Sequence, residues 1–153
     1  MGRVMALDWG EVRIGVALSD PLRLTSRALT TLTHRDAEKD TEAIRRIIEE
    51  HDVVEVIVGH PVHTDGGRGR VARAAEQFAE RLRANVEVPV LLWDERFTTQ
   101  EAARTLIEMN VKRRQRDRAI DRFAAALILQ GFLEFERQQS AGVAGDPGRS
   151  VSE

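Results

Sequence analysis

The chain has 153 residues, of which 42% are hydrophobic, enough for one core and too many for a disordered chain. Its 23 Lys and Arg nearly balance 25 Asp and Glu, which excludes a wholly basic nucleic-acid surface but not a local basic stripe. The absence of cysteine excludes disulfides and thiolate metal sites, and no apolar run approaches a membrane span. We expect a soluble, cytoplasmic protein with one domain, residues 1–138, and a disordered tail, residues 139–153.

The first part of the chain has the pattern of an antiparallel meander. Two β-prone segments, residues 3–7 and 13–18, flank a short turn that contains glycine, which predicts a β-hairpin. A Thr-rich stretch, residues 22–33, alternates polar and apolar side chains and predicts a third strand. Asp8 stands where the first strand ends. A carboxylate there needs an Arg, a helix N-terminus or a metal ion as its partner.

Helices and strands alternate in the rest of the chain. Helical periodicity predicts helices from Asp36 to about residue 51 and over residues 71–84, and strands are expected at residues 53–58 and 89–93. Thr98 or Thr99 can cap a further helix, and a basic connector precedes the last helix, which should end near residue 136. The apolar stripe of that last helix comprises Ile120, Phe123, Ala124, Leu127, Ile128, Gly131, Phe132 and Phe135.

This element order predicts an α/β fold, in which a mixed five-stranded sheet has helices on both faces. Ligands of such sheets gather beyond the carboxyl ends of the parallel strands. Asp8, the loop over residues 59–70 and the pair Asp94 and Glu95 all fall at such ends. The topology alone therefore predicts a site there.

Acidic residues could carry the chemistry of this site. Asp8, the pair Asp94 and Glu95, and Asp121 come from separate elements, and converging carboxylates repel one another unless a cation lies between them. Oxygen ligands without cysteine favour Mg²⁺ or Mn²⁺, and two such ions about 3.5–4 Å apart would support phosphodiester hydrolysis. In the alternative interpretation each acid is a helix cap or an ion-pair partner, for example of Arg13 or Arg96. The spacing leaves both interpretations open.

Two basic segments could contact phosphate. The Gly-rich loop at residues 63–70, which carries Arg68 and Arg70, could cradle a phosphate, although it lacks a Walker motif. Residues 112–122 contain six basic and two acidic side chains beside Asp121 and favour a nucleic-acid clamp through Lys112, Arg113 and Arg114. A solvated helix end is the alternative for this run.

Four segments of the sequence resemble the motifs of a known family. The segments MALDWGEVRIGVALSD, VGHP followed by DG, DERFTT and IDRFAAALILQGFL match, in order, the motifs of the YqgF family. The resemblance covers residues 4–133. Its members are small bacterial proteins with an RNase H-like fold, related to Holliday-junction resolvases and regarded as nucleases that mature the 5′ end of pre-16S rRNA.

The resemblance implies roles for individual residues. It makes Asp8, Glu95 and Asp121 the catalytic, metal-binding triad, with Asp94 as an alternative to its neighbour. It further implies nucleic-acid contacts or ligand positioning for Arg13, Arg96, Thr98, Thr99 and Lys112. In one departure, the family usually has Gly-Leu-Pro where this chain has Gly59, His60 and Pro61, which leaves the role of His60 open.

Together, these expectations predict a metal-dependent nuclease that acts on structured nucleic acid. The favoured reaction is 5′-end maturation of pre-16S rRNA. One alternative is a Holliday-junction resolvase, which would act on branched DNA as a two-fold dimer. A second is a non-catalytic RNA-binding ribosome-assembly factor. A third is an ATP-binding domain of the actin and sugar-kinase type, whose hairpin also begins Asp-x-Gly but whose two halves need a longer chain. Whether the protein is a monomer or a homodimer stays open.

Overall fold

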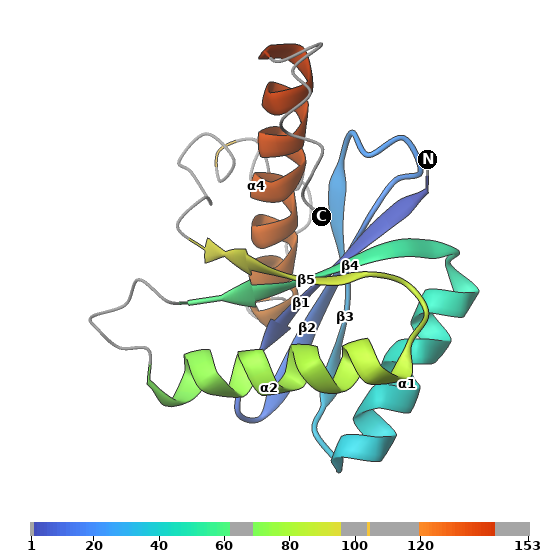
Figure 1. Cartoon of the computed structure of the whole chain (residues 1–153), viewed down its shortest axis with the longest axis vertical. Coiled ribbons are helices and arrows are strands. Elements are labelled where there is room, and N and C mark those ends of the chain that lie inside the picture. Colours follow the sequence, from blue (N-terminus) through green and yellow to red (C-terminus); the bar gives the residue numbers. More distant parts are fainter. Residues whose placement is uncertain (1, 62–68, 96–103, 105–119, 143–153) are drawn as a thin grey trace.

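The computed structural model describes residues 2–61, 69–95, 104 and 120–142 and forms a mixed sheet flanked by helices (Figure 1). The strands are β1 (Arg3–Trp9), β2 (Arg13–Ser19), β3 (Ser26–Thr33), β4 (Val53–His60) and β5 (Val90–Asp94). The helices are α1 (Ala37–Glu50), α2 (Arg70–Asn85) and α4 (Ile120–Gly142). The predicted α/β class is confirmed.

The sheet has the strand order β3-β2-β1-β4-β5. β2 pairs antiparallel with both β1 and β3, whereas β1, β4 and β5 run parallel to one another. The predicted meander followed by parallel units is therefore confirmed. Because β1, β4 and β5 share one direction, their carboxyl ends lie at the same edge of the sheet.

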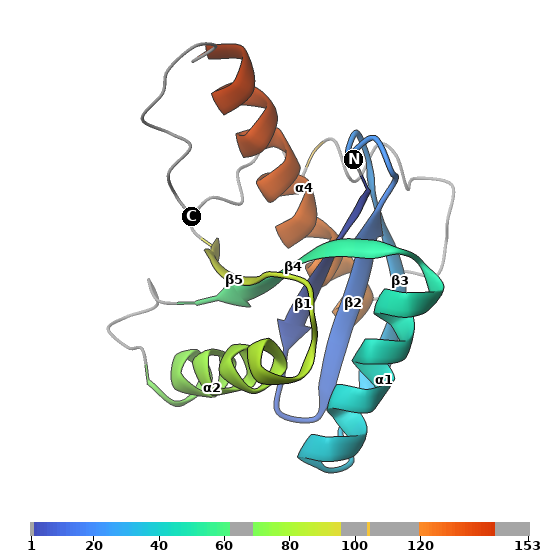
Figure 2. The same ribbon diagram turned by 45° about the vertical axis from the view of Figure 1, so that its right-hand side comes forward.

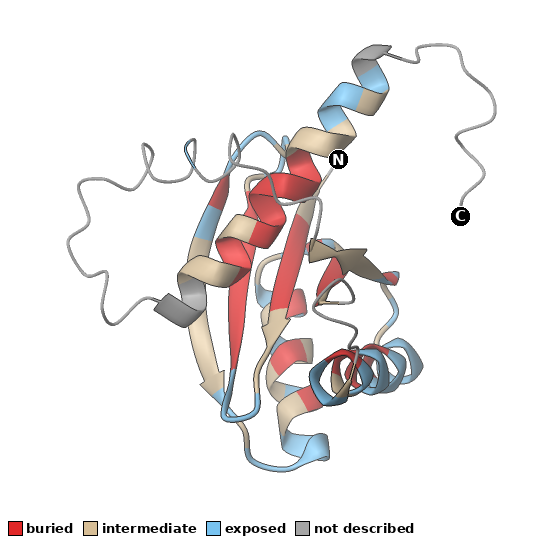
Figure 3. Ribbon diagram, turned by 90° about the vertical axis from the view of Figure 1, so that its left-hand side faces the viewer, coloured by how far each residue is buried: buried red, intermediate tan, exposed pale blue. Residues whose placement is uncertain are grey.

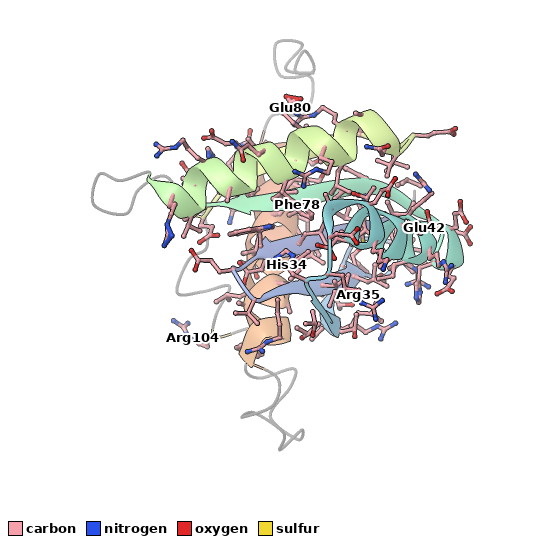
Figure 4. The ribbon with its side chains drawn as sticks, turned by 90° about the horizontal axis from the view of Figure 1, so that it is seen from below. His34, Arg35, Glu42, Phe78, Glu80 and Arg104 are labelled. Carbon is pink, nitrogen blue, oxygen red and sulfur yellow. The ribbon has the colours of Figure 1, made fainter. Side chains whose placement is uncertain are left out.

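Alternation along the strands divides the core into two layers. Met5 and Leu7 of β1 belong to the layer under α1 and α2, whereas Val4 and Ala6 belong to the layer under α4. Figure 2 shows α1 and α2 on one side of the sheet and α4 on the other. In Figure 4, Phe78 of α2 lies on the side facing the sheet and Glu80 lies on the outer side, as the amphipathic pattern predicts.

α4 packs against the second layer across several strands (Figure 3). The Ser26 hydroxyl donates a hydrogen bond of 2.8 Å to the carbonyl of Ala126, which joins the start of β3 to the helix. At the opposite edge of the sheet, in β5, the Trp93 ring contacts the rings of Phe132 and Phe135 edge-on, at centroid distances of 5.0 and 5.2 Å. These contacts fix α4 over the sheet. None of the described helices is long and apolar enough to cross a membrane.

Several element boundaries differ from the sequence-based expectation. β1 continues past Asp8 to Trp9, which pairs with Ile14 of β2. β3 begins at Ser26 rather than residue 22, because the Asp20 carboxylate accepts backbone N–H groups of the preceding residues and forms a turn. β4 continues through Gly59 to His60, since these residues pair with β5. α4 continues to Gly142, so residues 139–142, which we had assigned to the tail, are helical. The remaining tail, the helix expected after Thr99 (apart from the helical Arg104) and the basic connector lie outside the described residues.

Candidate active site

Asp8 lies near the carboxyl end of β1, half-buried, on the face that α4 covers. Its position follows from strand alternation, since Val4 and Ala6 on the same face pack under α4. Across β2 its partner is Gly15, which carries no side chain. Gly15 itself therefore adds no side chain beside Asp8 on the β2 side.

Glu95 directly follows β5, and its carboxylate lies over the backbone of Gly59 in β4. A Cβ atom added at Gly59 would come within 2.8 Å of Glu95 Oε2 and within 2.7 Å of Ile128 Cδ1. The carboxylate of Glu95 and the side chain of Ile128 in α4 thus fill the space that the missing side chain of Gly59 leaves. Gly59 is required here for close packing.

The backbone register brings Asp8 and Glu95 together. Leu7 pairs with Val58, so the next residues along these parallel strands are Asp8 and Gly59, and adjacent strands lie about 4.8 Å apart. Asp8 thus lies beside the residue over which Glu95 extends, on the same face of the sheet. Two carboxylates in this arrangement repel each other and provide the hard oxygen ligands that fit a divalent cation.

Asp121, the third predicted ligand, is the second residue of α4, and its side chain is not among those described. Within the described ranges, no group of three His, Cys, Asp or Glu side chains forms a metal site. The pair Asp8 and Glu95 is therefore the part of the predicted triad that the structure places, and the triad as a whole stays a prediction.

Asp94 lies on the other face of the sheet. It alternates with Val90 and Leu92, which both pack in the layer under α1 and α2, and it pairs with His60 across β4. His60 extends toward α2, where its Nε2 lies 2.7 Å from Glu76 Oε2. Between Asp94 and Glu95, strand alternation thus favours Glu95 as the neighbour of Asp8, and His60 is directed away from both candidate ligands.

Two of the predicted nucleic-acid contacts lie in the described part of the chain. Arg13 is the exposed first residue of β2, on the same face as Gly15 and therefore as Asp8. Arg70 begins α2, and its Nη2 atom lies 3.0 Å from Oε2 of Glu11 in the β1–β2 turn. Both side chains are largely exposed. The other predicted contacts lie outside the described residues: Arg68, Arg96, Thr98, Thr99, Lys112, Arg113 and Arg114.

The sequence interpretation missed the contribution of Gly15 and Gly59. Gly59 stands before Pro61 and reads as the end of a strand, whereas the structure uses it inside β4 as space for a carboxylate. Only the pairing of β1, β4 and β5 reveals this function, because it depends on which residues face one another across the sheet.

The fold defines a structural class, because a mixed sheet in the order β3-β2-β1-β4-β5 with helices on both faces is RNase H-like. The structure of Thermus thermophilus RuvC in complex with a Holliday junction substrate is similar, with a TM-score of 0.60 and 14% identity over 90% of this chain and 96% of that chain. The fowlpox virus Holliday junction resolvase has a TM-score of 0.50 and 13% identity, covering 87% of this chain and 99% of that one. At such identities the likeness establishes the fold.

The sequence comparisons identify the family. Residues 2–135 match the model of RuvX, described as Holliday junction resolvase. Relatives from Moorella thermoacetica, Koribacter versatilis and Halothermothrix orenii are 44%, 43% and 41% identical. The alignments cover 86%, 87% and 89% of this chain and 94%, 87% and 97% of the relatives, each named "Putative pre-16S rRNA nuclease". The chain belongs to the RuvX family, which confirms the resemblance seen in its motifs, and it is a nuclease-type hydrolase.

Proposed function

We propose that this protein is a divalent-metal-dependent nuclease that matures the 5′ end of pre-16S rRNA in the cytoplasm. The observation that carries the proposal is the position of the Glu95 carboxylate over Gly59, in the strand next to Asp8, at the edge where the parallel strands end. The names of the relatives support ribosomal RNA as the substrate.

Asp8, Glu95 and Asp121 would hold Mg²⁺ or Mn²⁺. When bound, the cation would supply a more acidic water as nucleophile and neutralise charge on the leaving oxygen. Position 121 supports the third role, because it precedes Ala125 by about one helical turn and Ile128 by two, and Ile128 Cδ1 reaches the space above Gly59.

The chain's own residues would position the substrate backbone. Arg13 begins β2 on the Asp8 face and pairs with Thr33 of β3, so a cationic and a hydroxyl side chain share the sheet beside the carboxylates. Arg68, Arg70, Arg96, Thr98, Thr99, Lys112, Arg113 and Arg114 are the further phosphate contacts that we propose. Ile128 and the aromatic cluster of Trp93 would exclude water from the α4 side of the site.

Cleavage of branched DNA is the second candidate. The description of the RuvX family and the likeness to a RuvC structure that contains a Holliday junction favour it. Symmetric cutting of a junction requires two active sites, and therefore a dimer of this chain. The third possibility, a non-catalytic RNA-binding assembly factor, predicts binding without turnover.

The test is cleavage of a 5′-extended 16S rRNA precursor and of a four-way DNA junction, each in Mg²⁺, Mn²⁺ or EDTA. Asp8→Asn and Glu95→Gln should each reduce the single-turnover rate by about 100-fold or more, because each removes a charged ligand at the reacting phosphate. Asp94→Asn is the matched control on the opposite face and should retain the parent rate.

The substrate that the parent cleaves faster decides between RNA maturation and junction resolution. Cleavage that persists in EDTA, or in Asp8→Asn at the parent rate, would contradict the proposed chemistry. Binding of the precursor without cleavage in either metal would instead support the assembly-factor alternative.

A further inference from the structure

His34 directly follows β3 and contacts the β1–β2 turn, residues 10–12, with its backbone and its ring. Its N–H donates to the carbonyl of Val12 at 3.0 Å, and its ring Nε2 lies 2.8 Å from the carbonyl oxygen of Gly10. The ring also packs against Trp9 at a centroid distance of 5.4 Å. In Figure 4, His34 is labelled in the region where the sheet meets α1.

The second ring nitrogen of His34 contacts α1. Nδ1 lies 2.8 Å from Oδ2 of Asp40, whose Oδ1 accepts the backbone N–H of Arg35 at 2.9 Å. The Asp40 side chain is only 11% exposed and that of His34 only 23%, so water replaces these contacts poorly. A single imidazole thus joins the β1–β2 turn to the first helix.

Each ring nitrogen of His34 lies within hydrogen-bond distance of an oxygen atom. Nε2 faces the Gly10 carbonyl of the turn, and Nδ1 faces the Asp40 carboxylate of α1. Both oxygens belong to groups that accept hydrogen bonds. The ring therefore holds the turn and the helix together through one side chain.

We infer that His34 positions the turn behind Asp8 by joining it to α1. Trp9 and Gly10 follow Asp8 directly, and the Gly10 N–H closes the turn by donating to the Arg13 carbonyl at 2.9 Å. A hydrogen-bonded ring at Gly10 thus restrains the backbone two residues from a proposed catalytic carboxylate. His34 itself is a positioning residue, and its effect on catalysis rests on the function proposed above.

The polar groups around His34 support this role. From α1, Asp40 contacts the ring directly. From the turn, Glu11 is engaged by Arg70 of α2 at 3.0 Å, and Arg35 adjoins His34 in the chain. Among the described groups, only Asp40 pairs with the ring, so Asp40→Asn should weaken the contact that holds the ring against the turn.

The contact between His34 and Asp40 can be tested without any substrate. Thermal unfolding of His34→Leu, Asp40→Asn and the double variant measures whether the two side chains act as a pair. The losses of the two single variants should not add in the double variant, because each already breaks the same contact. Fully additive losses would overturn the inference that the ring joins the turn to α1.

Hydrogen exchange tests the positioning role separately. His34→Leu and Asp40→Asn should speed exchange of the Gly10 amide by about 10-fold or more, while the amides of β4 keep the parent rates. Arg35→Ala is the control, since it leaves the ring contacts intact. Unchanged protection of Gly10 in His34→Leu would overturn the positioning role, and thermal unfolding confirms that each variant is folded.

Cleavage assays then connect the turn to catalysis. His34→Leu should lower kcat by about 10-fold with KM within about 2-fold, because the turn orients Asp8 and not the substrate backbone. His34→Gln should restore part of kcat, since its amide can still donate to Gly10. A parent protein that cleaves no substrate would refute the proposed function, while the unfolding and exchange measurements would still decide the inference about His34. A rise in KM of about 10-fold in His34→Leu, without a loss of kcat, would overturn the link to Asp8.

Discussion

At the scale of single residues, the candidate site depends on the absence of a side chain at Gly59. Glu95 Oε2 and Ile128 Cδ1 both lie within 3 Å of the point where a Cβ of residue 59 would stand. Real Cβ atoms do not approach other heavy atoms so closely, so any side chain here must displace the carboxylate or the helix. The absence of a side chain at Gly59 therefore allows the Glu95 carboxylate to lie where it does.

We predict that Gly59→Ala displaces Glu95 and lowers cleavage by about 10-fold to 100-fold, with a stability loss of at most about 1 kcal/mol, because both clashing atoms are the ends of flexible side chains. Adding Ile128→Val to Gly59→Ala shortens the second clashing side chain. The double variant should recover stability in urea unfolding but little activity, because the clash with Glu95 remains. Ile128→Val alone is the control, and a Gly59→Ala enzyme as fast as the parent would contradict the assigned position of Glu95.

At the scale of elements, the β2–β3 turn depends on the carboxylate of Asp20. Its Oδ1 accepts the N–H of Leu24 at 2.7 Å and of Thr25 at 2.8 Å, and its Oδ2 accepts that of Leu22 at 3.2 Å. Arg23, at a φ of 61°, joins this turn to Glu55 of β4 at 3.2 Å and to Glu136 of α4 at 3.1 Å. Arg23 thus connects the turn to β4 of the sheet and to α4.

The pH dependence of this turn follows from the pKa of Asp20. Burial acts to raise that pKa, but the backbone hydrogen bonds together lower it below its usual value of 3.8. A carboxyl with a lowered pKa in the folded state stabilises the fold above the unfolded value and loses this contribution as the pH falls through the folded value. The loss therefore belongs to the range below about pH 4.

We predict that Asp20→Asn lowers the free energy of unfolding at pH 7 by about 1 kcal/mol, because the hydrogen bonds lose their ionised acceptor. The difference from the parent should shrink between pH 4 and pH 2.5. Urea unfolding at both ends of this range measures it, and Glu87→Gln, an exposed change in the α2–β5 loop, provides the control. A difference independent of pH would show that the charge of Asp20 does not matter.

At the scale of the whole molecule, one helix holds the site together. α4 buries Ala125, Ile128 and Leu129 against the layer that contains Val4 and Ala6, on the face where Asp8 and Glu95 lie. α1 and α2 cover the opposite face, where their buried side chains belong to the other layer. Packing of α4 should therefore affect catalysis, and packing of α2 should affect stability alone.

We predict that Leu129→Ala and Leu82→Ala each cost about 2–5 kcal/mol, because both side chains are fully buried and leave cavities. At a temperature where both variants remain folded, Leu129→Ala should cleave at least about 5-fold more slowly than Leu82→Ala, since it loosens α4 over Glu95. Thermal unfolding and single-turnover cleavage measure the two effects. Equal rates in both variants would show that α4 does not hold the site.

Local patterns in the sequence accounted for most of the fold. Two β-prone segments around a glycine-containing turn predicted the hairpin, helical periodicity predicted the buried face of α2, and Asp36 was expected just before α1, where its Oδ1 accepts the Lys39 N–H at 2.8 Å. These features depend on neighbours a few residues away, so they can be read from the chain. The order of elements then predicted a mixed sheet, with Asp8, Asp94 and Glu95 at the ends of its parallel strands.

Only the tertiary structure decided which residues meet. The choice between Asp94 and Glu95, the use of Gly59 as space and the double contact of His34 each depend on register between distant strands or on helix packing. No local pattern encodes such contacts, because a shift of one residue in register would reverse every face. The sequence by itself determined the elements, their order and the kind of chemistry, whereas the packing of β1, β4, β5 and α4 decided where the carboxylates lie.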